Sequence, residues 1–187
     1  MEKELVGYHG TSSDRANKIK EHGFIKSNSE YSLPGDLGFG VYFYISRNSN
    51  DVPFDNATKY VKKAKFKYVD YVVIESLIKV NENKILDLND ENTRKNLELF
   101  TEKNYDKITK AAEKYKKTRA YKRGNLDGIA INLFINLLGL PTDAVIQDTH
   151  SNYDGIYKSS NFNKNGREIC VKDTSIIDFS NLKITKI

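Results

Sequence analysis

The two ends of the chain carry β-type patterns, whereas its middle carries a helical one. Apolar segments rich in β-branched and aromatic residues occur at Leu5–Tyr8 and Val41–Ile45, and again at Ala144–Gln147 and Glu168–Lys172. Between them, Asn89–Arg123 is charged, and its apolar residues recur at helical spacing. Because strands and helices are segregated along the chain rather than alternating, we expect an α+β fold.

Capping and turn residues predict several further elements. A helix should begin at Ser12-Ser13-Asp14 and end before Gly23, because Ser and Asp favour N-caps and Gly favours the C-terminal cap. A lysine-rich helix is expected at Asn56–Lys65 and a buried helix at Ile129–Leu138. Asn165-Gly166 is a typical two-residue turn. Additional extended segments are expected at Tyr68–Lys79, Gly155–Tyr157 and Leu182–Ile187.

Length and charge limit the organisation of the protein. The 187 residues are enough for one domain with a hydrophobic core, and no repeat or linker divides them, so residues 1–187 should form a single domain. The net charge is +5, and it is clustered: Lys59–Lys67 holds five lysines and no acid, and Thr101–Arg123 holds nine basic residues against three acidic ones. These clusters are either solvated helix faces or contacts to an anionic partner such as nucleic acid.

Several protein classes are excluded by residues that the chain lacks. No run approaches 18 apolar residues and the N-terminus has no apolar signal segment, so we expect a cytoplasmic protein without membrane contact. The single cysteine, Cys170, cannot form an internal disulfide, and its apolar neighbours predict a buried thiol. The three histidines are scattered and form no metal-binding motif, so no metal is expected.

The first motif that can carry chemistry is Tyr8-His9-Gly10-Thr11, at the end of the first strand. A glycine at Gly10 lets a planar ligand approach the backbone closely, and the imidazole of His9 can hydrogen-bond a ribose hydroxyl. A histidine that only stabilises the fold through a hydrogen bond would give the same local sequence.

The second motif runs from Asp36 to Tyr44, where two glycines lead directly into an aromatic strand. It is not the dinucleotide-binding fingerprint, because the third glycine and the following helix are both missing. Val41, Phe43 and Ile45 share one face of the strand, while Tyr42 and Tyr44 share the other. The tyrosine face can stack on a flat ligand, although a β-bulge entering a core strand would explain the glycines equally well.

The third motif is Gly166-Arg167-Glu168-Ile169-Cys170-Val171, which follows Tyr153-Asp154-Gly155-Ile156. Glu168 places a carboxylate at the start of an otherwise apolar strand. Such a carboxylate can stabilise a positive charge that develops during a reaction. A solubilising charge at the strand edge, or a structural salt bridge, is the alternative.

Together and in this order, the three motifs resemble those of the ADP-ribosyltransferase superfamily, and most closely the branch of diphtheria toxin and the poly(ADP-ribose) polymerases with its His-Tyr-Glu triad. His9, Tyr42 and Glu168 match the triad. The resemblance covers about residues 5–60 and 143–179. It implies a split antiparallel β-sheet core within the α+β class, with the segment of about 89–140 as a helical insertion.

The resemblance also implies a role for each matching residue, with NAD as the donor co-substrate. His9 would hydrogen-bond the adenosine ribose and Gly10 would hold the nicotinamide carboxamide. Tyr42 would stack on nicotinamide, with Tyr60 in Ala57-Thr-Lys-Tyr60 as the second ring. Glu168 would hold the nicotinamide ribose and stabilise the transition state. The catalytic residues are thus His9, Tyr42 and Glu168, and the NAD-binding residues are His9, Gly10, Thr11, Gly40, Tyr42 and Tyr60.

The function expected from this resemblance is mono-ADP-ribosylation of a protein or nucleic acid, as in a toxin or a host-modifying effector. Arginine is disfavoured as the acceptor, because the arginine-modifying branch has Glu or Gln where this chain has Gly166, and Arg where it has His9. The segment Lys158–Asn165 lies where the family recognises its acceptor. Two alternatives stay open: an NAD-dependent RNA 2′-phosphotransferase, and a catalytically degenerate binding or inhibitory module.

Overall fold

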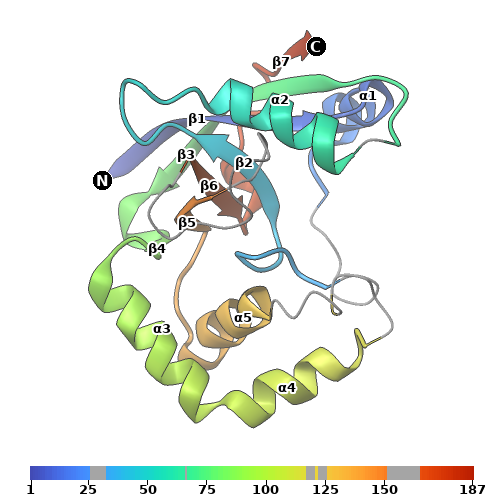
Figure 1. The fold of residues 1–187 in the computed structure, drawn as a ribbon. Coiled ribbons are helices and arrows are strands. Elements are labelled where there is room, and N and C mark those ends of the chain that lie inside the picture. Colours follow the sequence, from blue (N-terminus) through green and yellow to red (C-terminus); the bar gives the residue numbers. More distant parts are fainter. Residues whose placement is uncertain (26–32, 66, 117–120, 122–125, 151–164) are drawn as a thin grey trace.

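Seven strands form one hydrogen-bonded sheet in the order β4-β5-β6-β2-β1-β3-β7 (Figure 1). The structure is a computed structural model, and it describes residues 1–25, 33–65, 67–116, 121, 126–150 and 165–187. The elements are β1 (Glu2–Thr11), α1 (Ser13–His22), β2 (Val41–Ile45), α2 (Pro53–Ala64), β3 (Val72–Asn81), the 3₁₀ turn η1 (Glu82–Lys84), β4 (Ile85–Asp87), α3 (Glu91–Lys103), α4 (Tyr105–Glu113), α5 (Asp127–Leu138), β5 (Ala144–Thr149), β6 (Gly166–Val171), the 3₁₀ turn η3 (Thr174–Ile176) and β7 (Lys183–Lys186).

The sheet is nearly divided between β1 and β2. β1 pairs with β3 along its whole length, but it pairs with β2 at only two positions, Gly7 with Ile45 and Tyr8 with Tyr44. Every residue of β2, by contrast, pairs with β6. The sheet therefore consists of two halves, β4-β5-β6-β2 and β1-β3-β7, and backbone pairing between them stops beyond Tyr8.

One pair of strands, β4 and β5, is parallel. This corrects the expectation of a wholly antiparallel sheet, and the observed class is α+β with a mixed sheet. Parallel neighbours cannot be joined by a tight hairpin and need a long crossover. Helices α3, α4 and α5 lie between β4 and β5 in the chain and supply that crossover. The three residues of β4 were too few to give a recognisable strand pattern.

Different helices cover the two faces of the sheet. On one face, which we call the α1 face, the apolar side chains of the central strands pack against α1 and Phe24. On the opposite face, Cys170 packs near Ile131 of α5, and Tyr44 packs near Ala57 of α2. This second face, the α2–α5 face, is thus covered by α2 over one half of the sheet and by α5 over the other.

Most of the predicted elements are confirmed. The first helix spans Ser13–His22 and ends at Gly23, whose φ of 76° is the left-handed backbone that glycine tolerates. The second helix starts earlier than predicted, at Pro53, because proline is favoured in the first turn. The strand expected at residues 155–157 lies outside the described residues. No helix in the described part of the chain is long and apolar enough to cross a membrane.

Candidate functional site

The three sequence motifs lie on three neighbouring strands. β6, β2 and β1 are consecutive in the sheet, so Glu168, Tyr42 and His9 come from adjacent strands although they are far apart in the sequence. Their side chains do not all share one face. Tyr42 and Glu168 lie on the α2–α5 face, whereas His9 lies on the α1 face, where its ring contacts Phe24 and Phe43.

Glu168 is mostly buried and is held by two hydroxyl groups. Thr149 Oγ1 on β5 donates a hydrogen bond to Glu168 Oε1 over 3.0 Å, and the Tyr44 hydroxyl on β2 also hydrogen-bonds the carboxylate. Burial raises the pKa of Glu168 above its ordinary value, and the charge of Asp36 adds to this, while the two hydrogen bonds oppose it. Glu168 is therefore a desolvated, oriented carboxylate.

Tyr44, and not Tyr42, lies directly opposite Glu168. In the β2–β6 register, Tyr44 pairs with Glu168 and Tyr42 pairs with Cys170. The Tyr42 hydroxyl donates to Gly38 O over 2.8 Å and accepts from Leu37 N over 2.9 Å, and burial raises its pKa. Tyr42 therefore fixes the glycine turn that precedes β2.

His9 bridges the two halves of the sheet beyond the point where backbone pairing stops. Its Nδ1 lies 2.8 Å from Tyr42 O. A carbonyl oxygen only accepts, so Nδ1 carries the proton and donates, which leaves Nε2 as an acceptor in the neutral ring. Burial lowers the pKa of His9, and the nearby charges of Lys65 and Arg15 lower it further, so the ring stays neutral near pH 7.

The other residues assigned to NAD binding lie close to α2 and β6. Gly10 faces α2, where an added Cβ would be 2.5 Å from Ala57 O. An added Cβ on Gly40 would be 2.5 Å from Cys170 Sγ. The two glycines thus permit close packing of β1 on α2 and of β2 on β6. The remaining two are Thr11, which is buried, and Tyr60 of α2, whose ring centroid lies 6.3 Å from that of Tyr44.

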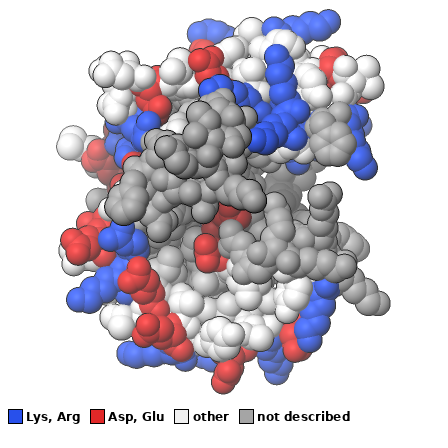
Figure 2. All heavy atoms as spheres, in the orientation of Figure 1, with Lys and Arg blue, Asp and Glu red and all other residues white. Residues whose placement is uncertain are grey.

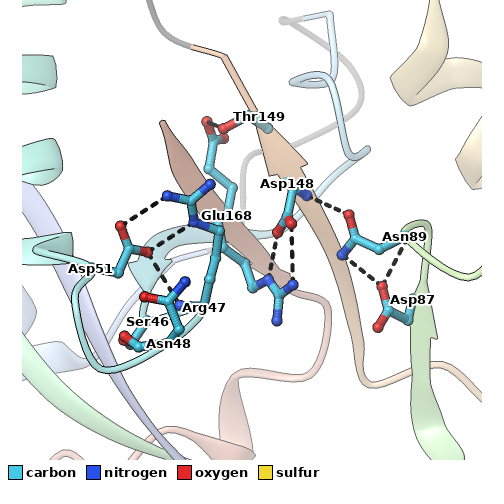
Figure 3. Close-up of polar contacts among 10 residues, drawn as sticks. Ser46, Arg47, Asn48, Asp51, Asp87, Asn89, Asp148, Thr149 and Glu168 are labelled. Carbon is cyan, nitrogen blue, oxygen red and sulfur yellow. Dashed lines mark hydrogen bonds and ion pairs between the residues drawn. The ribbon is translucent and has the colours of Figure 1, made fainter. Parts of the chain in front are cut away.

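Two further sets of polar contacts lie near Glu168 at this edge of the sheet (Figure 3). Arg47 bonds both carboxylate oxygens of Asp51, at 3.2 and 3.3 Å. Asp148, next to Thr149, is paired with Arg167, and its backbone N–H donates to Asn89 Oδ1 over 2.8 Å. The contacts of Asp148 join the start of the helical segment to β5 and β6, whereas the Arg47–Asp51 pair closes the turn that follows β2.

Helix α5 holds the glycine turn from the other side. An added Cβ on Gly128 would be 1.9 Å from Gly35 O, so the helix backbone and the turn are in direct contact. Asn132 Oδ1 accepts from Phe39 N over 3.2 Å, and Lys172 Nζ donates to Leu37 O over 2.7 Å. The segment that the resemblance leaves unassigned therefore positions the turn before β2.

Several of these residues were not predicted as site residues from the sequence. The alternation of β2 placed Tyr44 beside Tyr42, but the register that pairs Tyr44 with Glu168 has no sequence signal. Thr149 and Asn132 gave no local signal, because they act through partners 19 and 93 positions away. The expected acceptor-recognition segment lies outside the described residues, apart from Asn165.

Among the described residues, we find neither a metal-binding cluster nor a reactive cysteine near this site. No group of three or more His, Cys, Asp or Glu side chains among them is arranged to hold a metal ion. Cys170 is buried and forms no disulfide, and burial raises the pKa of its thiol. Cavities of about 450 and 340 Å³ lie beside η3 and between α3 and α5, and Glu168 lines neither of them.

Comparison of the chain with protein-family models, with curated proteins and with solved structures finds no match.

Proposed function

We propose that the chain is a mono-ADP-ribosyltransferase with an ADP-ribosyltransferase fold, which transfers ADP-ribose from NAD to a protein or nucleic acid and releases nicotinamide. The observation that carries this proposal is that the three motifs of the resemblance occupy consecutive strands, with Glu168 held as a desolvated carboxylate at one of them. Support also comes from the near division of the sheet between β1 and β2, where His9 bonds Tyr42 O.

Glu168 is assigned the central chemical role. The bond between C1′ of the nicotinamide ribose and the ring nitrogen breaks, and its electron pair leaves with nicotinamide. Positive charge then develops on the sugar, and an ionised Glu168 stabilises this charge more strongly than it stabilises ground-state NAD. The hydroxyls of Thr149 and Tyr44 hold the carboxylate in one orientation. A nucleophile of the acceptor forms the new bond to C1′ and loses its proton.

The remaining motif residues are assigned binding roles. His9 is neutral with Nε2 as an acceptor, which suits a hydroxyl of the adenosine ribose. Tyr60 is the ring that we assign to nicotinamide contact, because it is half-buried beside Tyr44 and close to Glu168's strand. Tyr42 acts through the glycine turn, to which its hydroxyl is bonded.

The test is release of nicotinamide from NAD by the full chain, with and without a cell lysate. We expect slow release with NAD alone, and a mass increase of one ADP-ribose unit on a lysate protein or nucleic acid. Release that requires a 2′-phosphorylated RNA would favour the phosphotransferase instead. No release with any of these additions would mean that the chain is a binding module.

A further inference from the structure

Two basic side chains from different helices lie beside the end of β1 that carries His9. Helix α1 starts directly after β1, which places Arg15 in its first turn. Helix α2 packs on the same end of β1, since a Cβ on Gly10 would be 2.8 Å from Val61 Cβ. Lys65 is the C-cap of this helix, and its backbone N–H donates to Val61 O over 3.0 Å. The two cations therefore flank one strand end.

A turn and an aromatic ring link the backbone of Lys65 to the side chain of Arg15. Tyr68 N donates to Lys65 O over 2.9 Å, which folds the chain back after α2. The Arg15 guanidinium lies over the Tyr68 ring, with Cζ 5.2 Å from the ring centroid. Stacking on a ring leaves the in-plane N–H groups of a guanidinium available for other partners.

Neither charge is neutralised by a neighbouring carboxylate. Among the described residues, Arg15 and Lys65 form no ion pair, and both side chains are exposed. At the start of α1, the carboxylate of Asp70 accepts a hydrogen bond from Ser13 N over 3.0 Å. Figure 2 shows basic atoms gathered over the part of the molecule that holds α1 and α2 in Figure 1.

We propose that Arg15 and Lys65 form a binding site for the phosphate groups of the dinucleotide donor; this inference rests on the proposed function. A guanidinium fork bonds two phosphate oxygens at once, and an ammonium group adds a point charge. The acceptor atom Nε2 of His9 lies at the same strand end and suits a ribose hydroxyl. Cations beside a ribose-binding group match a nucleotide better than they match the repeating phosphates of a nucleic acid backbone.

Lys65 also has a simpler explanation, because a lysine at the end of a helix favours the helix dipole. That explanation predicts an effect of Lys65 on stability alone. It does not explain why Arg15, from the first turn of another helix, lies beside the same turn.

Titration of ADP and adenosine into the full chain separates these explanations. Arg15→Gln and Lys65→Gln should each weaken ADP binding by about 10-fold, because each removes a charged hydrogen bond to phosphate. Both variants should bind adenosine as the wild type does. Lys20→Gln, which removes an exposed charge from the last turn of α1, is the matched control and should leave both affinities unchanged. Thermal unfolding checks that every variant is folded.

Three results would overturn this inference. The wild type and the two variants could bind ADP with equal affinity, or the wild type could bind ADP no more tightly than adenosine. The third is that the two substitutions weaken binding of a single-stranded oligonucleotide but leave ADP binding unchanged. The assay for nicotinamide release separates it from the proposed function. If the wild type releases nicotinamide but the affinity for ADP does not depend on Arg15 and Lys65, the phosphate site is wrong and the proposed function stands. If ADP binding depends on both residues but no nicotinamide is released, the site stands and the function is wrong.

Discussion

Tyr44 on β2 lies directly opposite Glu168 on β6, and its hydroxyl hydrogen-bonds the Glu168 carboxylate. The same arrangement recurs two strands away, where Tyr8 on β1 lies opposite Glu75 on β3 and hydrogen-bonds it. The two pairs differ in charge balance. Glu75 forms an ion pair of 2.7 Å with Lys183, whereas Glu168 forms none among the described residues. The uncompensated carboxylate is the one on the strand of the third motif.

The Tyr44–Glu168 hydrogen bond should control the pH dependence of the reaction. Tyr44→Phe removes a donor that favours the ionised carboxylate, so the pKa of Glu168 should rise further above its ordinary value. The ionised form of Glu168 is the active one in our proposal. The acid limb of the pH–rate profile for nicotinamide release should therefore move to higher pH. The rate on the plateau should change by less than about 10-fold, since the carboxylate itself remains.

The control for this variant is Tyr42→Phe. Its hydroxyl bonds Gly38 O and Leu37 N rather than Glu168, so the acid limb should stay where it is in the wild type. An acid limb that is unchanged in Tyr44→Phe, or that moves equally in both variants, would contradict the assigned pairing.

The burial of His9 should make the stability of the protein depend on pH. The folded state lowers the pKa of His9 below its ordinary value of 6.5, so the unfolded chain binds the proton more tightly. The free energy of unfolding should therefore decrease as the pH falls below about 6.5. Urea unfolding of the wild type and of His9→Gln between pH 5 and 8 checks this. The difference in stability between the two proteins should shrink towards low pH, and a constant difference would argue against a buried neutral imidazole.

Contact between α5 and the glycine turn should make Gly128 intolerant of a side chain. A Cβ there would be 1.9 Å from Gly35 O, so Gly128→Ala must displace the turn or the helix and should cost more than about 2 kcal/mol of unfolding free energy. Gly139→Ala is the comparison, because a Cβ there meets nothing within 4 Å and only the φ of 60° opposes it, at about 1 kcal/mol. Equal losses in denaturant unfolding would mean that this contact does not form.

Local sequence patterns predicted the elements whose formation depends on local residues. The helix Ser13–His22 follows from its capping residues, and the strand Val41–Ile45 from its unbroken β-type composition. Pairing between distant strands was not predictable. The parallel pair depends on Ile85–Asp87, which is too short to carry a period, and on a crossover of three helices whose direction no local residue specifies.

The candidate site was predictable to the same extent. The motifs around His9, Tyr42 and Glu168 are local patterns, and they could be recognised without a structure. The partners of Glu168 depend on strand register, because a shift of one residue between β2 and β6 would exchange Tyr44 for a residue of the opposite face. The proposed phosphate site depends on Arg15 in the first turn of α1 and on Lys65 at the C-terminal end of α2, and no local pattern specifies how these two helices are placed relative to each other.

The most direct test of the proposed function is single-turnover release of nicotinamide by the wild type, Glu168→Gln and Glu75→Gln at saturating NAD. Gln keeps the shape of the side chain and removes its charge. Loss of one preorganised charged group lowers a rate by about 10²–10³-fold, so Glu168→Gln should lose almost all release while NAD binding is nearly unchanged. Glu75→Gln, which alters the matching carboxylate on the same face, should release nicotinamide at the wild-type rate. Equal rates for the wild type and Glu168→Gln would make Glu168 a structural residue and contradict the proposed function.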